Sequence, residues 1–233
     1  MLWATILNRM KNNLLFLLLI ATITACTTTQ PLTSSVKPKE VMEMAYFKPY
    51  SYISLIEKGN KAKYNDSLSS FCNELQLKVI NKLSERIHLS EEINPIDTTT
   101  QHKLAREILY LCLIADRQRN IKNLKITPVI DSLLELNNKR FGLLTINTGF
   151  TRGSGNYGNQ IAKGVGIAIL TLGMYYQTPI KSNSTIYSMI VDSKENNIAF
   201  FRKNTINDKE PIDENVINSQ MQKIFEGYFW TEK

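Results

Sequence analysis

The sequence predicts an α/β fold in which helices pack on a mixed β-sheet. After residue 40, segments with helical periodicity alternate with segments rich in β-branched and aromatic residues. The run RFGLLTINT, residues 140–148, is almost continuously apolar, as expected for a strand that is covered on both faces. Two further β-rich runs, STIYSMIVD and NIAFFRK, are separated only by SKEN and predict an antiparallel hairpin. A parallel core that also carries this hairpin makes the predicted sheet mixed.

The first long helix is predicted over residues 67–84, because apolar residues recur there at three- and four-residue steps. Asn65 or Asp66 can accept the hydrogen bonds that cap its first turn. The predicted buried face of this helix consists of Leu68, Phe71, Cys72, Leu75, Val79, Ile80 and Leu83.

The remaining elements are assigned from the same kinds of signal. Helices are expected over residues 99–119, over residues 128–138 behind a threonine–proline start signal, and within ENVINSQMQKIFEGYF near the C-terminal end. Strands are expected over residues 50–59 and 86–89.

The N-terminal segment resembles the signal peptide of a bacterial lipoprotein. Its apolar run LLFLLLIATITA is shorter than the roughly 20 residues that a membrane span needs. Ile23, Thr24, Ala25 and Cys26 resemble the lipobox, where the peptide is cut before the cysteine and the cysteine is acylated. The resemblance implies lipid attachment at Cys26. Because Thr27 stands where an aspartate would retain such a protein in the inner membrane, it also implies the outer membrane, facing the periplasm or exposed on the cell surface. The alternative is an ordinary secretory signal with a chance cysteine.

The chain is expected to consist of a signal peptide at residues 1–25, a lipidated polar tether at 26–40 and one α/β domain at 41–233. The tether, with the sequence TTTQPLTSSVKPK, has little apolar surface to bury. The domain includes a glycine-rich apolar insert over residues 149–181. About 200 residues are enough for a single domain with its own hydrophobic core.

The charge balance is mildly basic. The formal net charge is +7, and removal of Arg9 and Lys11 with the signal peptide lowers it by two, to about +5. Lysine and arginine are scattered among acidic residues and are not interleaved with aromatic ones. Nucleic-acid binding is therefore not predicted.

No catalytic or metal-binding pattern is found in the sequence. There are two histidines, His88 and His102, and neither H-E-x-x-H nor C-x-x-C occurs. Ser154 lies between two glycines, but Arg152 and Asn156 occupy the two glycine positions of G-x-S-x-G. We therefore predict a protein that is not an enzyme and that has no cofactor and no metal ion.

Two cysteines remain beyond Cys26. Cys72 and Cys112 each lie within an apolar helical pattern, which favours two buried thiols. A disulfide between them is the alternative, because an extracytoplasmic compartment permits it.

The stretch GSGNYG, residues 153–158, has the G-x-G-x-x-G spacing of a dinucleotide-binding turn and follows a predicted strand. That fingerprint also needs an acidic residue about 20 residues further on, to bind a ribose. The chain has no Asp or Glu between Gly158 and Asp192. Dinucleotide binding is therefore not predicted, and binding of another ligand at this turn is kept as an alternative.

An uncharged apolar segment follows, from Gly164 to Ile180. Its length suffices for a transmembrane β-strand of about 9 to 11 residues, and as a strand it would place larger and smaller side chains on opposite faces. Its glycines would each cost about 1 kcal/mol inside a helix. The segment either covers the sheet as a short buried helix or loop, or it faces lipid or a neighbouring subunit.

A resemblance covers about residues 140–203. The succession of RFGLLTINT, the glycine-rich insert and a hairpin with Asp192 at its turn resembles the lipoprotein family that forms the curli secretion channel (CsgG-like). It is also similar to the N-terminal fold of TolB, the periplasmic protein of the Tol system. The resemblance implies a periplasmic α/β sandwich whose inserted hairpins assemble into an outer-membrane pore. This chain departs from the family in its turn, SKENN, which lacks the usual glycine, and in having only one long insert.

Together these observations predict a lipoprotein anchored in the outer membrane that acts by association with envelope proteins or with itself. One alternative is a pore-forming or secretion subunit whose segment Gly164–Ile180 enters the membrane. The other is a periplasmic ligand-binding protein that uses the turn at residues 153–158.

Overall fold

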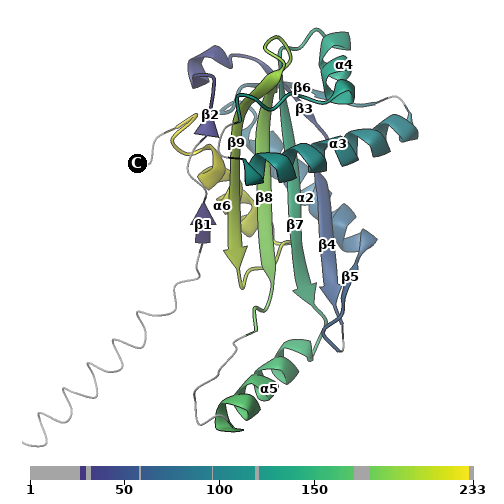
Figure 1. Ribbon diagram of the computed structural model, residues 1–233, viewed down its shortest axis with the longest axis vertical. Coiled ribbons are helices and arrows are strands. Elements are labelled where there is room, and N and C mark those ends of the chain that lie inside the picture. The colour runs from purple at the N-terminus through teal and green to yellow at the C-terminus, as the bar shows by residue number, and fades with distance from the viewer. Residues whose placement is uncertain are drawn as a thin grey trace, which may run out of the picture.

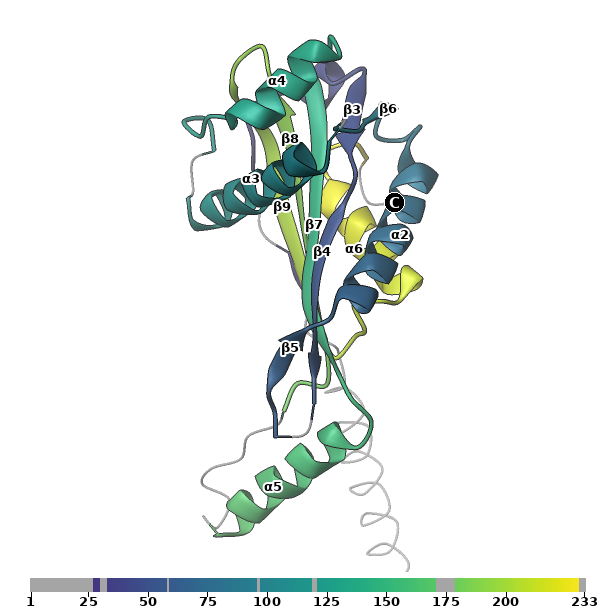
Figure 2. The ribbon, with the colours of Figure 1, turned by 90° about the vertical axis from the view of Figure 1, so that its right-hand side faces the viewer.

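One mixed β-sheet with helices on both faces forms the body of the protein (Figures 1 and 2). The computed structural model describes residues 27–29, 33–57, 59–95, 97–118, 121–170 and 179–230. Nine strands form the sheet, in the order β1-β9-β8-β7-β3-β6, with β4 on the same side of β7 as β3 and with β2 and β5 at the edges. The predicted fold class is confirmed.

The central strand is β7, Phe141–Arg152. On one edge it pairs in parallel with β3 (Met44–Phe47) and β4 (Tyr50–Ile56), and on the other it pairs antiparallel with β8 (Asn183–Asp192). Its first seven residues are buried, as predicted. The strand continues beyond the predicted end at residue 148, because both neighbours remain in register with it.

The predicted hairpin is formed by β8 and β9 (Asn197–Asn207). At its turn Asp192, which is fully buried, accepts two hydrogen bonds from Arg140: one from Nε at 3.0 Å and one from Nη2 at 2.7 Å. These bonds raise the pKa of the Arg140 guanidinium and compensate the buried charge of the carboxylate. Asn196, with φ of 48°, replaces glycine at the turn, which asparagine tolerates.

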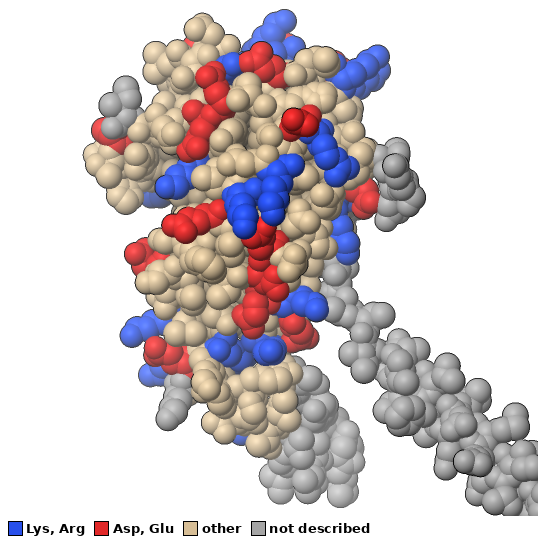
Figure 3. Space-filling model, turned by 180° about the vertical axis from the view of Figure 1, so that it is seen from behind, with Lys and Arg blue, Asp and Glu red and all other residues tan. Residues whose placement is uncertain are grey.

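The helices divide into two layers. Helices α2 (Asp66–Leu83) and α6 (Glu214–Phe225) cover one face, and α3 (Thr98–Arg117) and α4 (Pro128–Leu136) cover the other (Figure 2). On the α2 and α6 face, acidic and basic side chains are mixed, without a large patch of one sign (Figure 3). Glu214 there pairs with both Lys78 and Lys82.

Helix α2 begins where the sequence predicts, since the Asn65 side chain accepts a hydrogen bond from the Leu68 N–H at 2.9 Å. Phe71 is an error in the predicted buried face, because it is 48% exposed. Gln76 lies inside instead, and its Nε2 donates to Thr145 Oγ1 at 3.1 Å. This bond satisfies the Nε2 of the buried amide, whereas its Oε1 has no hydrogen-bond partner among the described residues.

Three short strands differ from the sequence prediction. The strand expected at residues 86–89 lies three residues later, as β6 (Leu89–Ile93), because a turn that ends at His88, φ 58°, precedes it. The strand β3 was not predicted. Strand β5 (Ala62–Tyr64), which pairs with the end of β4, was not predicted either.

The predicted tether at residues 26–40 is partly wrong. Residues Thr27–Thr29 (β1) and Thr33–Ser34 (β2) pair antiparallel with β9, and Pro38–Glu40 form a 3-10 turn (η1). Strand pairing uses backbone groups, so a polar segment without apolar side chains still binds a sheet edge. The predicted signal peptide and Cys26 lie outside the described residues.

The two cysteines lie on opposite faces of the sheet. Cys72 packs with the α2 and α6 layer and Cys112 with the α3 and α4 layer, and both thiols are free, so the alternative of a bridge between them is wrong. Burial raises the pKa of Cys72 to about 11 and also raises the pKa of Cys112. Neither thiol forms a reactive thiolate near neutral pH.

Gly149 lies where the paired strands β7 and β8 leave no room for a side chain, so a substitution there tests the packing of the pair. A Cβ at this position would lie 2.2 Å from the carbonyl oxygen of Asn183, whereas a Cβ on Gly158 would meet nothing within 4 Å. We expect Gly149→Ala to lower the free energy of unfolding by about 1 to 3 kcal/mol, as overpacking does. Gly158→Ala, which lies in a helix, is expected to be neutral or stabilising by up to about 1 kcal/mol. Denaturant titration measures both changes, and equal effects would contradict the packing described.

Alkylation tests the state of the thiols. In a chain carrying Cys26→Ser, iodoacetamide at mildly alkaline pH should leave Cys72 and Cys112 unmodified, because their raised pKa and burial keep them protonated and inaccessible. Mass spectrometry after unfolding in guanidinium should find both alkylated. Rapid alkylation of Cys72 in the folded protein would be incompatible with its buried position.

Candidate functional site

The apolar insert leaves the sheet at the end of β7. It continues as α5 (Asn156–Leu170), which extends beyond the ends of the strands and does not cover either sheet face (Figures 1 and 2). Residues 164–170 of this segment are helical, so the strand interpretation is wrong for them. Residues 171–178 lie outside the described residues. Beyond the sheet end the described chain offers no neighbouring strand, and a helix satisfies its backbone groups internally.

Arg152, which directly precedes the GSGNYG turn, connects this helix to the sheet. Its Nε donates to the Ile180 carbonyl at 2.9 Å, and its Nη1 donates to Asn60 Oδ1 at 2.7 Å and to Asn156 Oδ1 at 2.8 Å. The Asn156 amide in turn donates to the Glu57 carbonyl at 2.5 Å. A helix thus begins inside the motif, as a dinucleotide fingerprint requires, but these groups hold both ends of the insert to the β4–β5 hairpin. Ligand binding at the turn stays a prediction from the sequence alone.

The segment that follows Cys26 lies at the same end of the sheet. Thr27 pairs with Ile206, Ile206 with Ser184, and Ser184 with Gly149, so the four residues form one row across the sheet. Helix α5 leaves the sheet just beyond this row (Figure 1). The predicted acylation site, Cys26, directly precedes Thr27 in the chain.

A buried polar network holds this end together beneath α2 and α6. The Gln220 Nε2 donates to the carbonyls of Ser184 and Asn204, at 3.0 and 2.9 Å, and its Oε1 accepts from the Ser184 hydroxyl at 2.7 Å. Asn204 then donates to Thr29 Oγ1 at 2.5 Å. The network therefore connects α6 and the central strands with the segment that follows Cys26.

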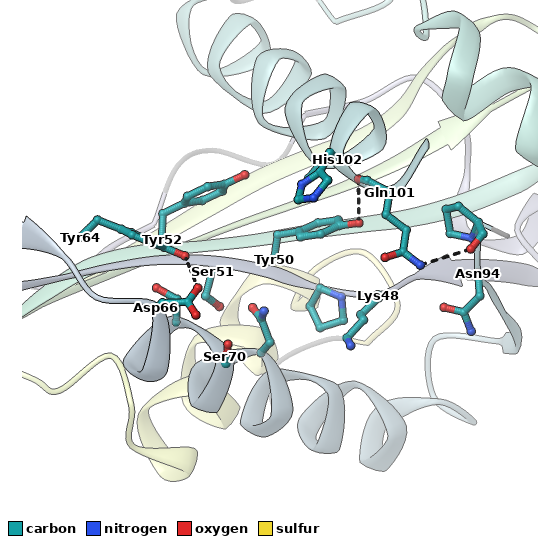
Figure 4. A pocket seen from close by; sticks show the side chains of 15 residues that line it. Lys48, Tyr50, Ser51, Tyr52, Tyr64, Asp66, Ser70, Asn94, Gln101 and His102 are labelled. Carbon is teal, nitrogen blue, oxygen red and sulfur yellow. Dashed lines mark hydrogen bonds between the residues drawn. The ribbon is translucent and has the colours of Figure 1, made fainter. Parts of the chain in front are cut away.

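A pocket lies elsewhere, at the edge of β4 between the first turns of α2 and α3 (Figure 4). Its volume is about 370 Å³. It is lined by Lys48, Pro49, Tyr50, Ser51, Tyr52, Tyr64, Asp66, Ser69, Ser70, Asn73, Asn94, Pro95, Gln101, His102 and Ala105.

The pocket exists because two short strands leave a gap on the outer edge of the sheet. Strand β6 pairs with β3 only as far as Phe47, and β5 pairs with β4 only from Ser54 onward. Between them the Ile53 N–H donates to Ser69 Oγ at 3.0 Å, and the Ile53 carbonyl accepts from the Asn65 N–H at 2.9 Å. Residues 48–52 have no strand on this side among the described residues.

The side chains of the pocket are mostly neutral hydrogen-bonding groups. The Tyr50 hydroxyl donates to the Gln101 carbonyl at 3.4 Å, and the Tyr64 hydroxyl donates to Asp66 Oδ1 at 3.3 Å (Figure 4). Burial raises the pKa of Tyr50 and Tyr52, which keeps both phenols protonated. This arrangement can bind polar groups through hydrogen bonds and apolar groups against the tyrosine rings.

The residues singled out from the sequence do not converge on this pocket. His102 is exposed on its rim, whereas His88 lies against Phe229 with ring centroids 5.8 Å apart. In the described part of the chain, no group of three or more His, Cys, Asp and Glu side chains is placed to hold a metal ion. None of the described helices is long and apolar enough to cross a membrane. The pocket residues were missed because they come from four elements (β4, β5, α2 and α3) and two loops, and only the aromatic run of β4 marked them.

Comparison with known proteins gives fold likeness only. No protein-family model and no curated protein match the chain. Among solved structures, it is similar to the PelC dodecamer from Paraburkholderia phytofirmans, with 7% identity and a TM-score of 0.40 over 89% of this chain and 100% of that one. It is also similar to a DUF4136 family protein from Bacteroides thetaiotaomicron, with 10% identity and a TM-score of 0.35 over 89% of this chain and 98% of that one. Since both TM-scores are below 0.5, neither neighbour brings a function to this chain.

Proposed function

We propose that the protein is a lipoprotein of the outer membrane, attached through Cys26 and facing the periplasm, and that it acts by association with envelope proteins or with itself. One observation carries the proposal: β1 fixes the residue after Cys26 to the same sheet end from which α5 extends. Acyl chains on Cys26 would therefore hold this end of the domain at the membrane surface.

The energetics of acylation support a stable attachment. Each buried CH₂ of an acyl chain contributes about 0.8 kcal/mol, and two or more chains hold a protein to a bilayer without a spanning helix. The antiparallel pairing of β1 with β9 leaves no long linker between the anchor and the folded domain. The domain would then stand close to the membrane, with its sheet end toward the lipid.

The apolar insert supports association. Its segment Gly164–Ile180 has no charged residue, and the part that lies in α5 projects from the sheet. A soluble domain rarely leaves a long apolar segment uncovered, because contiguous apolar surface favours contact with a protein or a membrane.

Acylation and location provide the test of this proposal. The full chain, produced in a Gram-negative host, should incorporate labelled palmitate and sediment with the outer membrane. Cys26→Ser removes the acylated thiol, so both the label and the membrane association should be lost. Cys72→Ala is the matched control and should behave as the wild type, because Cys72 is buried in the core. Persistent labelling of Cys26→Ser, or an unlabelled wild type, would refute the proposal.

A second candidate function is a pore or secretion subunit whose segment Gly164–Ile180 enters the membrane. The position of α5 at the same sheet end as β1 favours it, since acylation would bring the segment to the lipid.

The oligomeric state tests this second candidate. Electron microscopy of the full chain in detergent should find rings, and Ile167→Asp should abolish them, because a charge is costly inside a bilayer or an apolar interface. The thermal unfolding midpoint of the variant should be unchanged. A monomeric wild type would exclude the pore, and a strongly destabilised Ile167→Asp would assign the segment to the folded core.

A further inference from the structure

We propose that the open edge of β4 is a docking site for an extended peptide segment of a partner protein, which adds to the sheet by pairing with Ser51. The inference rests on the proposed function in one respect, that the protein works by association. It names the surface that the partner contacts and the conformation that the partner adopts.

The backbone groups along β4 alternate in direction. In a strand, successive residues direct their N–H and C=O groups alternately to the two sides. Leu55 pairs outward with β5, and Ile53 directs its N–H and C=O outward to Ser69 and Asn65. Ser51 is the next residue in this series, so its N–H and C=O point into the pocket, where no described strand pairs with them.

The gap at this edge has room for a short strand. Residues 48–53 separate the last pair with β6 from the first pair with β5, which at about 3.3 Å per residue leaves roughly 20 Å of edge. At one end Pro49 limits pairing because it has no N–H. At the other end the Ile53 N–H already donates to Ser69 Oγ. The site therefore suits a short extended segment that pairs through the peptide groups of one residue.

The two walls of the pocket differ in their chemistry. Side chains of an added strand would point alternately to the two faces of the sheet, and the pocket has one wall on each face. On the α3 side, Tyr50 and Tyr52 present aromatic rings. On the α2 side, Asn73 Oδ1 is buried and has no hydrogen-bond partner among the described residues. The walls thus fit a segment with an apolar side chain toward the tyrosines and a hydrogen-bond donor toward Asn73.

The charge distribution of the pocket limits which kind of partner fits it. Lys48 and Asp66 lie at the pocket with opposite signs, and the walls between them are neutral. An extended, mostly uncharged stretch of polypeptide fits this distribution better than an anionic or cationic ligand. A small polar molecule would use the side chains of the pocket but would not need the Ser51 N–H.

Peptides of random sequence test whether the edge of β4 binds an extended segment. A phage-displayed library of random heptapeptides is selected against the full chain in detergent. Ser70→Trp adds an indole to the pocket wall from an exposed position on α2, and Ser67→Trp adds one on the same helix outside the pocket. Enriched clones should bind the wild type and Ser67→Trp and lose binding to Ser70→Trp. No enrichment, or equal binding to both variants, would overturn the docking site.

The pairing itself is tested at Ser51. Ser51→Pro removes the outward N–H, and because the neighbouring even-numbered residues bond to β7, that ladder is kept. Binding of the enriched clones should fall about tenfold, the effect of one hydrogen bond of about 1.4 kcal/mol. Ser51→Ala, which keeps the N–H, should bind as the wild type. If Ser51→Pro is folded by circular dichroism and binds unchanged, strand pairing is excluded and a side-chain site remains.

The two proposals fail separately. Peptide selection needs neither acylation nor a membrane, so it can be repeated on Cys26→Ser. Loss of palmitate labelling with intact peptide binding would remove the anchor and leave the edge site. Normal labelling with no enriched peptide would remove the edge site and leave the anchor.

Discussion

The pairing of β7 on both of its edges is the constraint on which the structure depends. The parallel strands on one side of it are joined by crossovers: α2 lies between β4 and β6 and covers one face, and α3 and α4 lie between β6 and β7 and cover the other. Its antiparallel partner β8 brings β9 and, through β9, the segment β1 after Cys26. One strand thus positions both the sheet end that carries β1 and α5 and the open edge.

Buried polar groups make this arrangement specific. Thr145 and Asn147 on β7 bind Gln76 and Cys72 on α2, while Ser184 on β8 binds Gln220 on α6. A shift of one residue in either strand would turn these groups to the wrong face and leave their partners unsatisfied. The network therefore stabilises one register, and the register fixes which residue of β4 faces the gap between β5 and β6.

The two candidate surfaces lie at different places on the sheet and suit different contacts. The end of the sheet carries β1, Arg152 and the projecting helix α5, an arrangement suited to a membrane or to a neighbouring copy. The edge carries a pocket of hydrogen-bonding groups and one pair of outward backbone groups. An anchored domain with its end at the membrane would leave this edge accessible from the periplasm, where an extended segment of another protein could pair with it.

The sequence by itself determined the elements whose signal is local. Periodicity predicted α2, α3 and α6, continuous apolarity predicted β7, and spacing predicted the β8–β9 hairpin. Only the tertiary structure decided the places where strand pairing and packing override the local amino-acid composition. The polar threonines of β1 bind β9, Phe71 stays outside while Gln76 is buried, and the glycine-rich insert is helical over Asn156–Leu170. The open edge at Ser51 also could not be predicted, because it is created by where β5 and β6 end, and those ends depend on contacts between residues far apart in the chain.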